Sequence, residues 1–569
     1  MNNYYTQLSS IGLFLLWQML FIQLSIGIMW HLNVSIISYS WLIGFLLSCL
    51  FSYLFSNRKV CTIALSLGVW AVAVAVVCFF PDFSTDGQLY HQPMIFALAN
   101  GWNPILEHHN KIIADGWGVN IWLDHYCKGL EMLSASIFAI TGNIESGKAI
   151  NIVMPISFML LLYSFVTEKF RRLGHRRLIL FSIISSIPVI FASQMFTYYI
   201  DWCSYYIISL LLLACWHLYF NQVKGCLLIS IPVLFLSIGI KLNIAFYAVF
   251  FLLFMATFII AMNKTTKIVL KVGGVLLITG LISVCITNYN PYITNIIDHG
   301  NPIYPMSSNN EGMDFLNNGA EPDYIRQWPR LHKIVYSILS TPSNDHKEFH
   351  HPLELSKFED LSNPAPVIGG WGMLFPSILI CSVLLFLFSR KTMMKIWTAA
   401  FVFLLFSTLF VLPYGSCYRY VPFTSIIPII LLFYLDNYND KRWIKNMGSF
   451  LYILLLVNFV ITLTSTSILS VSNKIATSYY RKQIVSSSGI NKYITESWAF
   501  NFKIYGNHVE NNNVYLKLKD KSVYEWLDKG DSNYKRAHIQ PLKLYIDTTK
   551  VDINGNKTKI ESIILPNND

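Results

Sequence analysis

The chain has few charged residues for its length. Only 13% of its 569 residues are Asp, Glu, Lys or Arg, and 54% are hydrophobic, whereas soluble domains carry about 25% charged residues. This scarcity argues against an ordinary soluble protein and indicates a membrane protein. The net charge of +11 then reports topology, because Lys and Arg collect in cytoplasmic loops. We therefore expect membrane lipids around the chain and no nucleic-acid partner.

Three further features are missing from the sequence. The long polar segments hold almost none of the ten cysteines, which argues against a disulfide framework. The N-terminus lacks a basic segment followed by a small-residue cleavage site, so we expect the first apolar run to be kept as a membrane helix. His91, His108 and His109 match no compact zinc motif. The sequence leaves open whether a divalent cation such as Mg²⁺ or Mn²⁺ is used.

The apolar runs predict an all-α polytopic membrane protein. A bilayer core about 30 Å thick needs about 20 apolar residues per spanning helix, which predicts about thirteen spans. These are residues 10–30, 36–56, 60–80, 147–166, 178–196, 202–220, 225–240, 243–262, 268–287, 372–389, 395–413, 422–436 and 449–467. The apolar segment 129–142 is shorter, and we expect a half-inserted or juxtamembrane helix there.

Basic links fix the expected orientation. They occur at every second connection, at residues 56–59, 168–177, 221–224, 263–271, 389–395 and 440–445. By the positive-inside rule these links face the cytoplasm, and the N-terminus lies with them. We expect a bacterial inner or plasma membrane protein whose longer polar segments lie on the extracytoplasmic face.

The expected organisation has six parts. They are N-terminal membrane helices (1–80), a first large outer loop with juxtamembrane helices (81–146), further membrane helices (147–287), a second large outer loop (288–371), C-terminal membrane helices (372–467) and a soluble outer tail (468–569). Apolar and polar residues alternate in the tail, with an Asn-Gly turn signal, which predicts a small β-containing domain.

The first outer loop opens with an unusual concentration of ionisable residues. Its sequence "PDFSTDGQLYHQPMIFALANGWNPI" places Asp82, Asp86, Tyr90 and His91 directly after a membrane span. Ionisable groups at the membrane boundary are costly and mark functional sites. In a helix Asp86 and Tyr90 share one face. The alternative is that Asp86 simply caps a helix.

These motifs resemble those of the GT-C superfamily of membrane glycosyltransferases, which take sugars from polyprenyl-phosphate donors. The resemblance is carried by "DGQLYHQP" and "NGWNPI" in the first loop. It continues through "YYIDW" (198–202), "GIKLN" (239–243), "GNPIYP" (300–305), "GGWGMLF" (369–375) and "YRYVP" (418–422). It covers about residues 81–436. In familiar members the catalytic loop follows the first helix, whereas here it follows the third.

The resemblance implies an inverting transfer to a surface glycan or lipid acceptor, with an aspartate as general base. Asp86 is the expected base, Asp82 is the alternative carboxylate, and Asp201 assists the base or positions the acceptor. Cationic groups should hold the departing phosphate. The expected donor-binding residues are Arg419, Lys241, Tyr90 and His91. The expected acceptor or sugar cavity contains Asp124, His125, Trp102 and Tyr304.

Structural explanations compete with several of these roles. Arg419 and Lys241 could snorkel to the interface, and Asp201 could cap the next helix. Trp102 could belong to an interfacial aromatic belt, and the two prolines around Tyr304 could serve only to fix a rigid turn.

Two other functions also fit a many-helix protein with long outer loops. One is a polymerase or ligase of lipid-linked surface polysaccharide, which would join preassembled repeat units. The other is a lipid-glycan flippase or transporter, which would need charged or broken helices in mid-membrane. Ionisable residues confined to one face favour an enzyme over a transporter.

Overall fold

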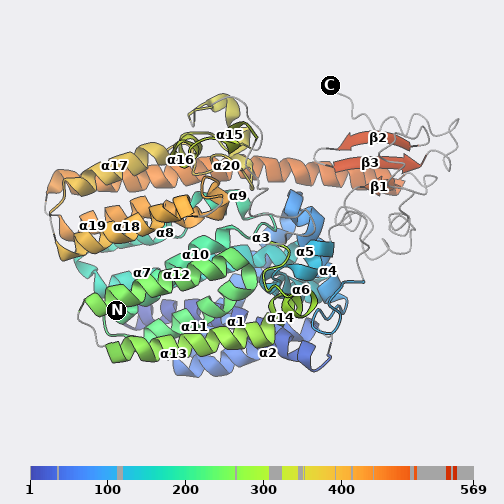
Figure 1. Cartoon of the computed structure of the whole chain (residues 1–569), viewed down its shortest axis with the longest axis horizontal. Helices are drawn as coiled ribbons and strands as arrows, with labels where there is room; N and C mark the ends of the chain where they lie inside the picture. The colour runs from blue at the N-terminus through green and yellow to red at the C-terminus, as the bar shows by residue number, and fades with distance from the viewer. Residues whose placement is uncertain are drawn as a thin grey trace.

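The computed structural model describes residues 2–34, 37–111, 120–262, 266–306, 323–343, 350–351, 353–390, 392–411, 414–439, 441–486, 493–495, 534–539 and 542–547. Within these ranges nearly all of the regular structure is helical. The long helices pack lengthwise into one bundle (Figure 1).

Among the described residues, nine helices are long and apolar enough to cross a membrane. They are α1 (Asn2–His31), α3 (Lys59–Phe79), α7 (Ile150–Lys169) with the preceding turn η3 (Ile144–Ala149), α10 (Trp202–Tyr219), α11 (Val223–Ile240), α12 (Leu242–Ala261), α13 (Thr266–Ile282) continuing into η5 (Ser283–Thr287), α18 (Met393–Val411) and α20 (Arg442–Ser486). Four shorter apolar helices are α2 (Ser38–Phe51), α6 (Gly129–Thr141), α17 (Phe375–Leu387) and α19 (Ile426–Tyr438).

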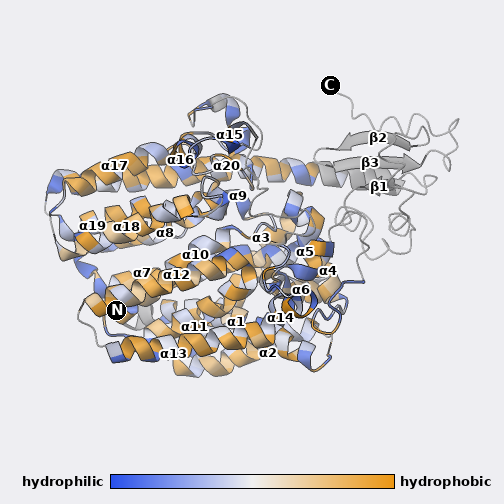
Figure 2. Ribbon diagram, viewed as in Figure 1, coloured by the Kyte–Doolittle hydropathy of each residue, from blue (hydrophilic) through white to orange (hydrophobic). Residues whose placement is uncertain are grey.

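The outer helices consist largely of hydrophobic residues (Figure 2), and many of their apolar side chains are exposed. Leu277 of α13 is 67% exposed and Phe403 of α18 is 76% exposed. Large contiguous apolar surfaces of this kind are rare on soluble monomers. The exposed faces therefore agree with the prediction of an all-α membrane protein.

Nine of the thirteen predicted spans correspond to the long helices, and three, at 36–56, 372–389 and 422–436, correspond to shorter helices. The remaining predicted span is wrong. Residues 178–196 do not form a single helix but two short ones, α8 (His175–Ser185) and α9 (Val189–Gln194). Pro188 lies between them in an extended conformation, with ψ at 156°. Proline has no N–H to donate and disfavours helical geometry in the residue before it, so the helix stops. The short segment expected at 129–142 is indeed a single short helix, α6.

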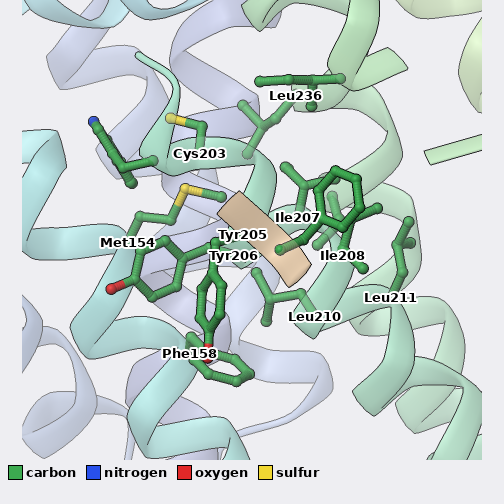
Figure 3. Packing of buried hydrophobic residues seen from close by; sticks show 14 of the residues in the cluster. Met154, Phe158, Cys203, Tyr205, Tyr206, Ile207, Ile208, Leu210, Leu211 and Leu236 are labelled. Carbon is green, nitrogen blue, oxygen red and sulfur yellow. The ribbon is translucent and has the colours of Figure 1, made fainter. Parts of the chain in front are cut away.

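The break between α8 and α9 is stabilised by buried tyrosines of α10. The last carbonyls of a helix have no partner within it. Here the hydroxyls of Tyr205 and Tyr206 donate to the carbonyls of Ser185 and Ser186 at 2.8 and 2.7 Å. The same face of α10 packs against Met154 and Phe158 of α7, with Leu236 of α11 nearby (Figure 3). Thus α10 lies at the centre of the core.

The basic links gather at one end of the bundle. Arg177 lies 3.3 Å from Asp436, and Arg172 donates to the carbonyl of Asn437 at 3.1 Å. Lys224 donates to the carbonyl of Leu54 at 2.6 Å. Connections that are far apart in the sequence are therefore neighbours at this end.

The opposite end carries the two long polar segments. The first contains the π-helical turn η2 (Gly87–His91), α4 (Gln92–Ala99), α5 (Asn120–His125) and α6. The second contains α14 (Tyr289–His299), α15 (Asp323–Arg326), α16 (Arg330–Ile338), η6 (Leu355–Lys357) and η7 (Glu359–Ser362). In Figure 1, α4, α5, α6 and α14 lie together at the right.

The β-containing domain predicted for the tail is not supported. Helix α20 continues to Ser486, so residues 468–486, assigned to the tail from sequence, belong to a helix. Beyond it the described residues form three short antiparallel strands in the order β1 (Tyr493–Thr495), β3 (Leu542–Asp547), β2 (Tyr534–Ile539). The rest of the tail, including the alternating stretch at 512–527, lies outside the described residues.

The two ends of the bundle lead to a prediction about topology. Asn57 and Leu106 are exposed at opposite ends. We expect Asn57→Cys and Leu106→Cys to react with a membrane-impermeant maleimide from opposite sides of a sealed vesicle. The exposed Cys61 and Cys285 would first be replaced by serine. Labelling of both cysteines from the same side would contradict this arrangement.

Candidate active site

The segment after α3 places Asp86 at the polar end of the bundle. The chain is extended at Phe80, and Asp86 immediately precedes the π-helical turn η2. Such turns occur frequently at functional sites. Asp86 stands at the N-terminal position of η2, but its side chain makes no capping hydrogen bond. The capping explanation of Asp86 is therefore not supported.

Asp82 has a structural position instead. It is 1% exposed, and its carboxylate accepts hydrogen bonds from the backbone N–H groups of Ser84 and Tyr198 and from the Gln92 amide, at 2.8, 3.1 and 3.2 Å. A side chain at Gly87 would collide with this carboxylate. Asp82 therefore ties the first loop to the segment before α10 and is a poor candidate for the alternative base.

Four distant segments meet in one ion network at Arg419. The guanidinium, in the short helix η8 (Tyr418–Tyr420), lies 3.3 Å from Asp86 Oδ2 through Nη2 and 3.4 Å from Asp201 Oδ2 through Nε. Lys241 Nζ lies 2.7 Å from Asp201 Oδ1. The structure thus brings together Asp86, Asp201, Lys241 and Arg419, which sequence motifs alone had grouped.

Asp201 and Lys241 lie at the ends of helices, where the backbone conformation places them in the network. Asp201 precedes α10 but makes no side-chain cap, which argues against a mere capping role. Gln194 clamps this junction, because its amide donates to Asp201 Oδ2 at 3.4 Å and accepts from the backbone N–H of Trp202 at 3.0 Å. Lys241 is extended, with φ at −163°, and separates α11 from α12.

Exposure distinguishes the carboxylates. The side chain of Asp86 is 22% exposed and that of Asp201 is 2% exposed. Lys241 and Arg419 are 23% and 14% exposed. Asp86, Lys241 and Arg419 are therefore reachable from outside, whereas Asp201 lies beneath them.

The buried charges in the network stabilise one another. Burial alone would raise the pKa of Asp201, but Lys241 and Arg419 hold it below its ordinary value. Burial alone would likewise lower the pKa of Arg419, and the Asp201 carboxylate and its neighbours raise it instead. Opposite charges at this distance favour the ionised form of each group. Asp201 is thus a fixed negative charge that positions the two cations.

Tyrosines surround the ions. Tyr90 donates to Asp86 Oδ2 at 3.4 Å, the neighbour expected from their spacing. Arg419 Cζ lies 5.3 Å from the ring centroid of Tyr199 and 5.0 Å from that of Tyr420, and Lys241 Nζ lies 5.2 Å from Tyr420. These distances fit cation–π contacts.

Three predicted cavity residues form a second cluster. Asp124 and His125 end α5, and the ring of Tyr304 lies 4.8 Å from that of His125. Burial raises the pKa of Asp124 and lowers that of His125 to about 4. Aromatic side chains join the two clusters, because Tyr126 lies 5.9 Å from Tyr90, centroid to centroid.

Two predicted site residues lie elsewhere. His91, expected at the donor phosphate, is 2% exposed and pairs with Glu131 through Nδ1 at 2.5 Å. Trp102, expected to meet a sugar, is 1% exposed, and its indole N–H donates to the carbonyl of Glu107 at 2.9 Å. Both side chains are in the protein interior.

The sequence prediction missed Gln194, Tyr420 and Lys128. Tyr420 directly follows Arg419 in the sequence, and this adjacency could have identified it as a site residue. Lys128 is 1% exposed and donates to the carbonyls of Asp124 and Tyr126 and to Asn290, while burial lowers its pKa to about 8. Nothing in the sequence distinguishes this buried lysine from a surface one.

Comparisons with known proteins give no match, either to a family model, a curated protein or a solved structure. The resemblance to membrane glycosyltransferases therefore rests on short motifs alone, and the activity it implies is a prediction.

The contacts of Asp82 lead to a prediction about stability. In Asp82→Asn, one carboxylate oxygen becomes an amide N–H₂ that faces an existing donor, whichever way the amide turns. We expect the free energy of unfolding to fall by about 2 kcal/mol or more, measured by thermal unfolding in detergent. The control Asp298→Asn, whose exposed pair with His108 is worth about 1 kcal/mol or less, should unfold nearly as the parent does. An Asp82→Asn protein as stable as the parent would show that Asp82 has no such structural role.

Proposed function

We propose that the chain is a membrane glycosyltransferase that moves a sugar from a polyprenyl-phosphate donor to a glycan or lipid acceptor. The observation that carries this proposal is the convergence of one accessible carboxylate, Asp86, with two cations, Arg419 and Lys241, at the polar end of a membrane bundle. An inverting transfer needs a base for the acceptor and positive charge for the leaving phosphate.

Asp86 acts as the general base. Its carboxylate takes the proton of the acceptor hydroxyl as the hydroxyl oxygen bonds to the anomeric carbon. The bond from that carbon to the phosphate oxygen breaks, and its electron pair stays on the phosphate. Asp86 is chosen over Asp201 because its side chain is 22% exposed and that of Asp201 is 2% exposed.

Arg419 and Lys241 receive the developing phosphate charge. The distances of 3.3 and 3.4 Å from Arg419 to its two carboxylates exceed the 2.7–2.9 Å of strong charge-assisted bonds. Arg419 Nε is buried and faces Asp201 Oδ2. The side chains of Arg419 and Lys241 are nevertheless 14% and 23% exposed, which supports an anionic ligand that reaches these cations from outside. Asp201 keeps both cations in place.

The reaction takes place at the extracytoplasmic face of a bacterial plasma membrane. The basic links lie together at the other end of the bundle, and such links stay in the cytoplasm. The N-terminus lies with the basic links (Figure 1). A donor carried on a membrane lipid would reach the ion network from the bilayer, and an acceptor would reach it from outside.

Replacing the proposed base tests the mechanism. We expect Asp86→Asn to lower transfer of a single labelled sugar from a polyprenyl-monophosphate donor by 10²–10⁴-fold, the usual contribution of a general base. Donor binding should be kept, because Arg419 and Lys241 are unchanged. Asp298→Asn, a carboxylate outside the network, is the control and should transfer at the parental rate.

Two outcomes would contradict this assignment. Parental turnover by Asp86→Asn would remove Asp86 as the base. Joining of preassembled repeat units, with no single-sugar transfer by the parent, would identify a polymerase or ligase instead.

Replacing the arginine tests the phosphate site. We expect Arg419→Ala to need at least about tenfold more donor, and Arg419→Lys to recover only part of this loss, because lysine lacks the planar fork that binds phosphate through two bonds. Donor titrations of the transfer rate measure both. Arg177→Lys changes an arginine that pairs with Asp436 at the other end and should behave as the parent does. An Arg419→Lys enzyme equal to the parent would show that the guanidinium does not bind the phosphate.

A further inference from the structure

Three metal-binding side chains come together beside the ion network. His109 Nδ1 lies 3.1 Å from Asp124 Oδ2. One potential ligand atom from each of His109, Asp124 and His125 lies within 4.8 Å of the others. Two of the three residues end α5, and the third belongs to the preceding loop, so the cluster depends on the fold and not on a compact sequence motif.

The cluster has the composition of a zinc-type site. Two imidazoles and one carboxylate are ligands that Zn²⁺ binds at about 2.0–2.2 Å. At such bond lengths the ligand atoms of a tetrahedral ion lie about 3.4 Å apart. The most widely separated of the three atoms must therefore approach one another by at most about 1.4 Å. The exposed ring of His109, whose side chain is 66% exposed, has room to make that movement.

A hydrogen bond to Asn295 holds His125 in the tautomer that binds metals. His125 Nδ1 lies 2.8 Å from Asn295 Oδ1. The Asn295 amide is oriented by its N–H₂ group, which donates to the carbonyl of Tyr304 at 2.9 Å. An amide oxygen only accepts, so Nδ1 carries the proton and the lone pair is on Nε2. Metal-binding histidines are commonly oriented in this way.

The carboxylate of Asp124 is also held in position by a hydrogen bond. Its side chain is 6% exposed, and its Oδ1 accepts the backbone N–H of Asn110 at 2.7 Å. Oδ2 is the oxygen next to His109. Lys128 donates to the backbone carbonyl of Asp124 at 3.1 Å and not to the carboxylate. Among the described residues this buried carboxylate has no lysine or arginine in an ion pair, and buried charges are normally paired or bound to a metal.

We propose that His109, Asp124 and His125 bind a single divalent cation of the zinc class. The exposed side of His109 leaves a further coordination position for water. Because α5 also carries Trp122, which packs 4.5 Å from Tyr126, the ion would fasten the loop before α5 to the aromatic side chains that flank Tyr90. Binding of a cation here does not require the proposed transfer reaction.

Zinc binding by the purified full-length chain tests the proposal. After treatment with a chelator, the parent should bind a single Zn²⁺ per chain. When Co²⁺ is added to the chelated protein instead, the complex should show the visible absorption of tetrahedral Co²⁺. We expect His109→Gln and Asp124→Asn each to weaken binding by at least about tenfold. His109 is exposed, so its variant should fold even if Asp124→Asn does not.

His108→Gln is the matched control. This neighbouring histidine pairs with Asp298 at 2.7 Å and lies outside the cluster, so its variant should bind zinc as the parent does. The proposal is overturned if the chelated parent takes up no stoichiometric zinc. It is also overturned if His108→Gln and His109→Gln lose binding equally, since that result would indicate adventitious binding by surface histidines.

Discussion

The arrangement of the polar end depends on one guanidinium shared between two carboxylates. Arg419 contacts Asp86 and Asp201, which come from connections more than a hundred residues apart. A charge in this position is costly unless it is paired. Asp201, Arg419 and Lys241 satisfy one another, and Gln194 and the tyrosines enclose them. These ion pairs consequently connect the loop after α3, the start of α10 and the segment before α19, in addition to the apolar packing between the helices.

Most of the membrane architecture could be predicted from hydropathy, because long apolar runs have few alternatives to a helix. The failures have local causes. Pro188 divides a stretch that is mainly apolar on both sides of the proline, so a hydropathy average cannot detect the break. Helix α20 extends past its apolar part to Ser486, where polar residues give no signal that distinguishes a continuing helix from a new domain.

The members of the ion network could be predicted, since ionisable residues at the ends of apolar runs are conspicuous. The role of each ionisable residue was harder to predict. Asp82 and Asp86 look alike in the sequence, but only the fold brings the N–H groups of Ser84 and Tyr198 to Asp82. His91 was misplaced for a related reason, because its partner Glu131 is forty residues away. Such long-range pairings determine which polar side chains are structural and which remain accessible.

The π-helical turn at Gly87–His91 has a consequence for how this segment tolerates change in length. A π-turn accommodates one residue more than an α-turn. Deleting a single residue here would restore the regular ladder and rotate Asp86 by about 100° around the helix axis relative to α4. A substitution at the exposed Leu89 of this turn can be accommodated, but a one-residue insertion or deletion would move the carboxylate away from Arg419. Natural variants of this protein should therefore keep the number of residues between Asp86 and α4 even where the residue types differ.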